Sequence, residues 1–224
     1  MKISAVLHFS ALDYPDKFSA VLFSQGCPLR CVYCHNPQFQ DSYLPGAVDF
    51  ADVLAFLQKR VGLLEAVVFS GGEPLLQSDL GECMRQVKEL GFLIGLHTSG
   101  AGYDNFVNIL PLVDWVGFDI KAVFGKYPAI ANVQADILKI KLSFNALISS
   151  GVSYEIRTTV DSRYISVNDL VEIAQFLRGA GVKKWVLQEC ILRHQAGEDR
   201  HLPLPAAEEL EALRQYIDVS VRTA

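Results

Sequence analysis

The sequence predicts an α/β fold in which helices cover a parallel sheet, and three observations lead to this prediction. Short apolar runs alternate six times with segments of helical character along the 224 residues. The connections are short, and no repeat, low-complexity tract or linker divides the chain. This alternation is typical of βαβ units. Six units are too few for a closed eight-stranded barrel, so an open partial barrel or a doubly wound sheet remains.

Each predicted strand is a short apolar run bounded by glycines or polar motifs. The run at 18–23 stops at a cysteine-rich loop, and the run at 65–70 is followed at once by Gly-Gly-Glu-Pro. Continuous apolar runs of this length are typical of strands buried on both faces. The six predicted strands are 18–23, 65–70, 92–96, 115–118, 153–160 and 184–188.

Capping residues and terminating glycines mark the predicted helices. Asp49 precedes apolar residues at helical spacing, and Asn168 is expected to cap a later helix. Gly91 is placed to close the second helix, and Pro205 to open the last one. The predicted helices are about 49–60, 78–90, 105–110, 133–149, 168–178 and 205–216.

Composition excludes several classes of protein. The formal net charge of −5 and the scattered lysines and arginines give no basic face, so direct binding to nucleic acid is not expected. Half of the residues are hydrophobic, yet no apolar run reaches the ~20 residues needed to cross a membrane. The N-terminus does not resemble a signal peptide. We therefore expect a cytoplasmic protein that does not bind membranes.

The most informative stretch is the loop after the first predicted strand. Three of the five cysteines, Cys27, Cys31 and Cys34, lie within it at the spacing C-x3-C-x2-C. Gly26 and Pro28 oppose a continuous helix there. Thiolates that converge from a short loop suit zinc or an iron–sulfur cluster. A four-iron cluster usually takes four thiolates, so three local cysteines suggest one iron open to another ligand.

Other interpretations of the triplet compete with the cluster. The cysteines could be small buried hydrophobic residues, or they could hold a structural zinc ion with His35 or Cys190 as fourth ligand. The run from Cys31 to His35 also matches the C-x-x-C-H pattern of c-type haem, although this match is short. Disulfide pairing is disfavoured by the odd number of cysteines. The cluster accounts best for the dense spacing.

Topology predicts that scattered polar motifs meet at one rim. Right-handed helical crossovers place the C-terminal ends of parallel strands on the same side of a sheet. The cysteine loop and Gly-Gly-Glu-Pro each follow a predicted strand. Other polar residues also end or follow predicted strands: Thr98, Ser99, Asp119, Lys121 and Gln188.

These motifs resemble those of a known family. The cysteine spacing, with Tyr33 before the last cysteine and Gly-Gly-Glu-Pro at 71–74, resembles the radical S-adenosylmethionine (radical SAM) enzymes. Longer stretches resemble the activating proteins of glycyl radical enzymes, most closely the activator of anaerobic ribonucleoside-triphosphate reductase: Asp-Tyr-Pro at 13–15, Gln-Gly-Cys at 25–27 and Cys-His-Asn-Pro at 34–37. The resemblance is sharp to about Lys121 and recognisable to Gln188.

The resemblance implies a fold, two cofactors and a reaction. It implies a partial (β/α)6 barrel of the radical SAM type, as one domain over 1–224 with a core of about 15–190 and a C-terminal helical tail at 191–224. Cys27, Cys31 and Cys34 would ligate a [4Fe-4S] cluster whose open iron binds S-adenosylmethionine. Reductive cleavage would give a 5'-deoxyadenosyl radical, which abstracts hydrogen from a glycine of a partner enzyme.

Several residues then gain expected roles in binding the cofactor. Gly71 and Gly72 would let the backbone approach the methionyl amino group, and Glu73 would add an acceptor for the ammonium. Tyr33 could frame the adenine, or it could be a core aromatic residue. Thr98 and Ser99 could bond polar groups of the cofactor, or they could cap the next turn.

Four further positions complete the expected site. Asp119 and Lys121 resemble a pair near the cofactor of related activases, although a solvated surface pair is the plainer interpretation. Arg157 lies inside an apolar strand, so it needs a carboxylate or a cofactor as partner. Gln188 ends the sixth strand. Some relatives bind a monovalent cation with an Asp where this chain has His97, which argues against a cation site here.

The remaining cysteines and histidines receive weaker assignments. Cys83 falls on the apolar face of the second helix and is expected in the core. Cys190 follows the last strand and could approach the rim. No convergent partners are evident for His8, His194 and His201.

The expected function is activation of anaerobic ribonucleotide reductase, with a flavodoxin or ferredoxin as electron donor. Two alternatives stay open. One is a radical SAM enzyme that acts on a small molecule, similar to 7-carboxy-7-deazaguanine synthase. The other is a metal or electron-transfer module without catalysis.

Overall fold

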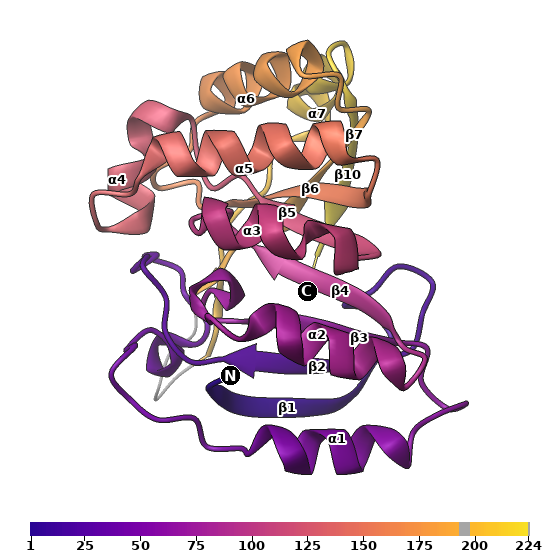
Figure 1. Cartoon of the computed structure of the whole chain (residues 1–224). Helices are drawn as coiled ribbons and strands as arrows, with labels where there is room; N and C mark the ends of the chain where they lie inside the picture. Colours follow the sequence, from indigo (N-terminus) through magenta and orange to yellow (C-terminus); the bar gives the residue numbers. More distant parts are fainter. Residues whose placement is uncertain (193–197, 224) are drawn as a thin grey trace. The chain divides into compact units, whose positions relative to one another are not determined.

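A computed structural model describes residues 1–192 and 198–223, which form two compact units (Figure 1). The first unit comprises Met1–Pro28, Asn36–Gly117 and Leu138–Tyr154. The second comprises Leu29–His35, Phe118–Ile137 and Glu155–Ala224. The units are assembled from interleaved segments, so no single cut separates them. The assignment of one domain stays a prediction.

The first unit is built on four strands. The antiparallel pair β1 (Ile3–Ser10) and β2 (Ser19–Ser24) is followed in parallel by β3 (Ala66–Gly71) and β4 (Leu93–Thr98). Because β2, β3 and β4 run in the same direction, their C-terminal ends lie at the same edge. This edge carries the start of the cysteine loop and the motifs that follow β3 and β4.

A capping aspartate and a terminating glycine mark the ends of two helices in the first unit. In α1 (Phe50–Gln58), the side chain of the N-cap residue Asp49 accepts a hydrogen bond from Ala51 N, as predicted. Past α2 (Leu80–Glu89), Gly91 has φ +92°, a conformation that glycine adopts without strain. Figure 1 shows α1 beside β1, where His8 packs on Phe56 with ring centroids 4.6 Å apart. The other helices are α3 (Tyr103–Ile109) and α5 (Ile137–Ser150), with short 3-10 turns at Pro37–Phe39, Pro74–Leu76 and Leu110–Leu112.

The second unit contains the end of β5 (Trp115–Asp119) and the parallel strands β6 (Ser153–Val160), β7 (Lys184–Glu189) and β10 (Asp218–Arg222). A small antiparallel pair, β8 (Ile191–Leu192) and β9 (Arg200–His201), follows β7. The helices of the second unit are a 3-10 turn at Phe124–Lys126, α4 (Tyr127–Ala131), α6 (Val167–Gly179) and α7 (Ala207–Arg214). Helix α7 packs against α6 and β10.

Each unit has an apolar interior. In the first, Tyr14, Val21, Val68 and Trp115 belong to one buried cluster, in which Tyr14 and Trp115 pack with ring centroids 5.5 Å apart. In the second, Trp185 is fully buried, and its indole N–H donates to Thr158 Oγ1 at 3.0 Å. A buried indole N–H needs such a partner, so this bond fixes β7 against β6.

The alternation of strands and helices is confirmed, with four corrections. Helix α6 is capped by Ser166, in a capping box with Asp169, and not by Asn168. Helix α5 begins at Ile137 and not at 133. The tail expected to be helical also contains strands, and the strand β10 was missed. The strand β1 and the helix α4 were not predicted either. In the described part of the chain, no helix is long and apolar enough to cross a membrane.

Candidate active site

The cysteine loop leaves β2 through a stem that belongs to the first unit. Gly26 has φ +99° and donates its N–H to Phe39 O at 2.7 Å, and Cys27 donates its N–H to Gln40 O at 3.1 Å. The backbone around Cys27 is thus held by residues that follow the loop. The thiol of Cys27 is partly exposed.

The rest of the loop, Leu29–His35, belongs to the second unit and is fixed at three points. Arg30 N donates to Ala131 O at 2.8 Å, and Val32 N donates to Ile130 O at 3.0 Å. His35 Nε2 lies 2.9 Å from Ile191 O. Because a carbonyl can only accept, this nitrogen carries the proton. The loop is therefore held by helix α4 on one side and by β8 on the other.

The thiols of the loop have the donor chemistry of an iron–sulfur site. Cys31 and Cys34 are half-buried residues joined by a tight turn, in which Cys34 N donates to Cys31 O at 3.0 Å. Burial raises the pKa of Cys31, and the nearby positive charge of Lys121 partly opposes this rise. Within residues 1–192 and 198–223, no three His, Cys, Asp or Glu side chains form a preassembled metal-binding group. Ligation by the three cysteines therefore stays a prediction, supported by their type and spacing.

The Gly-Gly-Glu-Pro turn packs directly onto the stem of the cysteine loop. A Cβ on Gly71, which has φ +110°, would lie 2.2 Å from Ser24 N, and one on Gly72 would lie 2.2 Å from Gly26 O. Gly72 N donates to Ser24 O at 2.9 Å, and Glu73 N donates to Gly26 O at 2.8 Å. The two glycines are thus required for contact between backbones, whatever ligand they also meet.

Glu73 is only 1% exposed and is the centre of a buried hydrogen-bond cluster. Its carboxylate accepts from Thr98 Oγ1 at 2.6 Å, from Ser99 N at 2.9 Å, from Ser99 Oγ at 2.5 Å and from Leu75 N at 3.2 Å. These bonds join the turn after β3 to the end of β4. The hydroxyls of Thr98 and Ser99 therefore donate to Glu73, and direct contact of these three residues with a cofactor stays a prediction.

Replacing Glu73 by glutamine is expected to change how stability depends on pH. Burial raises the pKa of Glu73, so the folded state holds this proton more tightly than the unfolded state does. The stability of the wild type relative to Glu73→Gln should be highest below about pH 4.3, the ordinary pKa, and should fall as pH rises through the folded pKa. Urea unfolding of both metal-free chains at a series of pH values measures this difference.

The control for this prediction is Glu82→Gln on α2. Hydrogen bonds from Gln86 and Arg85 lower the pKa of this exposed carboxyl. The contribution of Glu82 to stability should therefore depend on pH in the opposite direction and be lost as pH falls. A pH-independent difference for Glu73→Gln would contradict the raised pKa.

His97 is held by neighbours within the first unit. Its Nε2 lies 2.9 Å from Asp13 O, and its Nδ1 lies 3.4 Å from Ser70 Oγ. The ring also packs edge-on against Trp115, with centroids 5.5 Å apart. Since the Asp13 carbonyl only accepts, Nε2 donates and Nδ1 is left to accept from Ser70.

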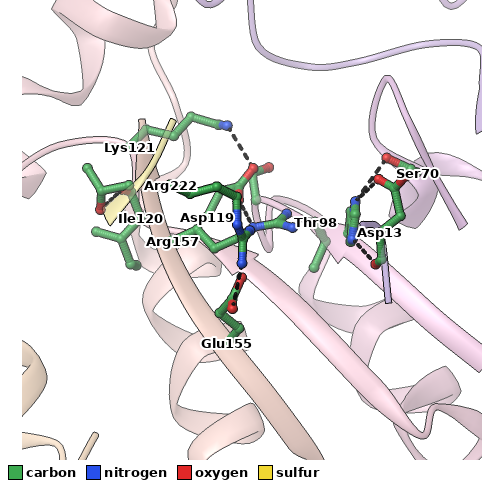
Figure 2. Close-up of polar contacts among 12 residues, drawn as sticks. Asp13, Ser70, Thr98, Asp119, Ile120, Lys121, Glu155, Arg157 and Arg222 are labelled. Carbon is green, nitrogen blue, oxygen red and sulfur yellow. Dashed lines mark hydrogen bonds and ion pairs between the residues drawn. The ribbon is translucent and has the colours of Figure 1, made fainter. Parts of the chain in front are cut away.

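In the second unit, a carboxylate links two cations (Figure 2). Arg157 on β6 is 6% exposed and donates its Nε to Asp119 Oδ1 at 2.9 Å, while Lys121 Nζ lies 3.4 Å from Asp119 Oδ2. The predicted need of Arg157 for a carboxylate is thereby confirmed. The backbone supports the pair, because Ile120 N donates to Arg157 O at 2.9 Å. The side chain of Asp119 is 30% exposed, and its contact with Arg157 is shorter than its contact with Lys121.

Lys121 lies among groups that keep it charged. Burial alone would lower the pKa of Lys121, but the acidic groups around it, the carboxylate of Asp119 among them, outweigh burial, so the pKa lies well above its usual value. Burial raises the pKa of Tyr33 beyond its usual range, so this phenol stays neutral. Burial likewise raises the pKa of Tyr127 to about 12, and the hydroxyl of this residue accepts from Lys121 N at 3.0 Å. Tyr127 was missed in the sequence analysis.

The remaining candidates lie where their strands and helices place them. Gln188 is partly buried on β7, opposite Thr159 of β6. Cys83 is buried on α2, as expected. Cys190 is buried beyond β7, and burial together with nearby Asp161 raises the pKa of its thiol to about 12. His201 Nδ1 lies 2.9 Å from Glu189 Oε1, a partner that was not anticipated, whereas His194 lies outside the described residues.

Comparison with known proteins places the chain in a family. The family model for the radical SAM superfamily matches residues 21–177. A provisionally named glycyl-radical enzyme activating enzyme of Methanocaldococcus jannaschii is 31% identical over 236 residues, which cover 99% of this chain and 95% of that protein. The pyruvate formate-lyase-activating enzyme of Clostridium pasteurianum is 35% identical over 127 residues, which cover 54% of this chain and 53% of that protein.

Solved structures agree on the fold. A radical SAM methyltransferase from Sphaerobacter thermophilus superposes with a TM-score of 0.68 at 17% identity, over 94% of this chain and 67% of that one. Streptococcus suis SuiB bound to S-adenosylmethionine gives 0.65 at 17% identity, over 91% of this chain and about half (49%) of that one. These likenesses confirm the predicted partial barrel of the radical SAM type. This chain is therefore an enzyme of the radical SAM superfamily, and it belongs there to the family of glycyl-radical enzyme activating enzymes.

Proposed function

We propose that this enzyme installs a glycyl radical on anaerobic ribonucleoside-triphosphate reductase. The observation that carries the proposal is the identity with a relative named for glycyl-radical enzyme activation, which extends over nearly all of both chains. The choice of partner rests on the stretches at 13–15, 25–27 and 34–37, which resemble the activators of that reductase.

We propose that Cys27, Cys31 and Cys34 ligate one [4Fe-4S] cluster. Three thiolates leave one iron open, and S-adenosylmethionine is the ligand proposed for it. When bound, the two cofactors supply one electron and a 5'-deoxyadenosyl radical, which takes hydrogen from the partner's glycine. A flavodoxin or a ferredoxin is the proposed source of the electron.

The protein's own contribution in this proposal is binding and orientation. The backbone at Gly71 and Gly72 would receive the methionyl end of the cofactor, and the buried carboxylate of Glu73 would hold this turn against Thr98 and Ser99. The other proposed contacts come from groups of the second unit: Tyr33, Asp119, Lys121, Arg157 and Gln188. A fixed pattern of charges lowers the cost of reorganisation when the cofactor binds.

Asp119 links the two cations of this set. It holds Arg157 at 2.9 Å and has a longer contact of 3.4 Å with Lys121. A cofactor carboxylate would therefore meet two cations that both contact Asp119. We propose that Lys121, which is only 13% exposed at its side chain and stays charged, is the more available of the two.

The experiment that tests this proposal measures where the radical forms. The reconstituted, reduced enzyme is mixed anaerobically with S-adenosylmethionine and anaerobic ribonucleotide reductase, and electron paramagnetic resonance (EPR) records a glycyl radical. The control reductase carries alanine in place of the radical glycine. We expect a signal only with the native reductase.

Other outcomes would redirect the assignment. A radical on pyruvate formate-lyase alone would change the partner and keep the activase function. Turnover of a pterin without any protein radical would favour a small-molecule enzyme. A reducible cluster that never cleaves S-adenosylmethionine, even with a partner, would favour an electron carrier. The cytoplasmic location stays a prediction.

A further inference from the structure

A short segment of the second unit, residues 124–132, has no role in the chemistry described so far. We call it the clamp segment; it comprises the turn Phe124–Lys126, helix α4 and Asn132. Its first residues, the turn Phe124–Lys126, contact α6. Phe124 packs at a right angle on Phe176, with ring centroids 5.1 Å apart, and Lys126 Nζ lies 2.7 Å from Asp169 Oδ2. The segment is therefore tied to a regular helix of 13 residues.

One contact of the clamp segment reaches the backbone between the charged residues of the proposed site. Lys121 N donates to the hydroxyl of Tyr127 at 3.0 Å, and Tyr127 is fully buried. Its ring stacks on Phe124, with centroids 5.8 Å apart and planes 19° apart. A buried N–H needs a partner, so the hydroxyl fixes the backbone from which the Lys121 side chain departs, two residues after Asp119.

Two more contacts reach the cysteine loop. The last carbonyls of a helix have no partner within it. In α4 these carbonyls accept from the loop, Ile130 O from Val32 N at 3.0 Å and Ala131 O from Arg30 N at 2.8 Å. The helix ends there because Asn132 adopts a left-handed backbone, with φ 52°. The two donors flank Cys31, so the same five-residue helix holds the loop that carries this thiol.

We propose that the clamp segment fixes the cysteine loop with respect to the Asp119–Lys121 pair, and that Tyr127 is a positioning residue for the cofactor. The inference rests on the proposed function and adds to it a residue that touches no reacting atom. Within the second unit, α4 is bonded both to the backbone beside Cys31 and to the backbone of Lys121. A single helix thereby sets the distance between a proposed cluster ligand and a proposed cofactor contact.

The first test removes one hydroxyl with Tyr127→Phe. We expect the Lys121 amide of the metal-free protein to exchange with solvent deuterium about tenfold faster, because it loses its partner. In the reconstituted protein, the KM for S-adenosylmethionine should rise about tenfold, while kcat changes less than about twofold and iron per chain is unchanged. The matched control is Tyr164→Phe, which removes the hydroxyl of a half-exposed tyrosine whose ring faces Arg163. Wild-type exchange and KM in Tyr127→Phe would overturn the role of Tyr127.

The second test strains the end of α4. Asn132→Gly keeps the left-handed backbone, whereas Asn132→Val opposes it with a β-branched side chain. We expect Asn132→Val to lose iron to a chelator about tenfold faster than wild type, and Asn132→Gly to match wild type. Asp16→Val is the control, since Asp16 has φ 58° in an exposed turn of the first unit. Equal rates in all four proteins would overturn the role of the clamp segment.

The wild type separates failure of this inference from failure of the proposed function. A wild-type protein that binds no cluster or no S-adenosylmethionine would remove the proposed function, and the inference with it. A wild type that binds both, with variants that do not differ from it, would leave the proposed function standing and remove only the clamp.

Discussion

Replacing Cys31 by alanine is expected to abolish cluster binding and every activity that depends on it. A four-iron cluster needs its thiolates, and a loop with two remaining cysteines cannot hold three irons in place. We expect iron and sulfide per chain to fall to less than about a tenth of the wild-type value after anaerobic reconstitution. Metal analysis and the EPR spectrum of the reduced protein measure this loss. Cys27→Ala and Cys34→Ala should behave in the same way.

Cys83→Ala is the matched control for the cysteine variants. Cys83 is buried on α2, 3% exposed, between the apolar residues Leu80 and Val87 of the same helix. Its loss should cost about 1 to 2 kcal/mol of stability through lost packing and leave the iron content unchanged. A full cluster in Cys31→Ala, or a lost cluster in Cys83→Ala, would contradict the assignment of the ligands.

Gly72→Ala is expected to destabilise the fold strongly, before any cofactor is considered. The new Cβ would lie 2.2 Å from Gly26 O. The backbone fixes the position of both atoms, so no side-chain rotation can relieve the clash. The turn after β3 would have to leave the stem of the cysteine loop and break the hydrogen bond from Glu73 N to Gly26 O. We expect a loss of roughly 3 kcal/mol or more in the free energy of unfolding of the metal-free protein, measured with urea.

The control for Gly72 is Gly179→Ala at the last residue of α6. Neither glycine has a left-handed backbone, and a Cβ on Gly179 meets no heavy atom within 4 Å. This variant should be neutral or more stable by up to about 1 kcal/mol, because alanine favours the helix and restricts the unfolded chain. Equal stability of Gly72→Ala and wild type would show that the close contact at this turn is not needed.

Much of the fold could be predicted because its signals are local. The apolar run at 153–160 coincides with β6 (Ser153–Val160), and Asp49 caps α1 as its position before an amphipathic stretch suggests. The cap of α6 was misplaced by two residues, because Ser166 and Asn168 are both good capping residues. Only the bond between Ser166 and Asp169 decides between them, and sequence does not show it.

Two of the missed elements, β10 and α4, depend on distant partners for their stability. Strand β10 is a short stretch that forms a strand through parallel pairing with β7. Helix α4 has only five residues, too few to be stable alone. The cysteine loop holds its last carbonyls, while Asp169 and Phe176 hold the turn Phe124–Lys126 that precedes it. The start of α4, Tyr127-Pro128, is more typical of a turn.

The candidate site was predictable in its residue types and not in its bonds. The cysteine spacing and Gly-Gly-Glu-Pro are recognisable from the sequence alone. An Arg157 within an apolar strand predicts a carboxylate partner, and Asp119 is that partner. Nothing in the sequence links Glu73 to Thr98 and Ser99, which follow it by about 25 positions. Such side-chain bonds depend on the register between β3 and β4, which only the folded chain sets.

The measurement that tests the central claim most directly is formation of 5'-deoxyadenosine. The reconstituted enzyme is reduced anaerobically and given S-adenosylmethionine, with and without anaerobic ribonucleotide reductase, and the product is quantified alongside methionine. We predict equal amounts of both products from the wild type and neither from Cys31→Ala. No 5'-deoxyadenosine from a wild type with an intact, reducible cluster, even with the reductase present, would contradict the account.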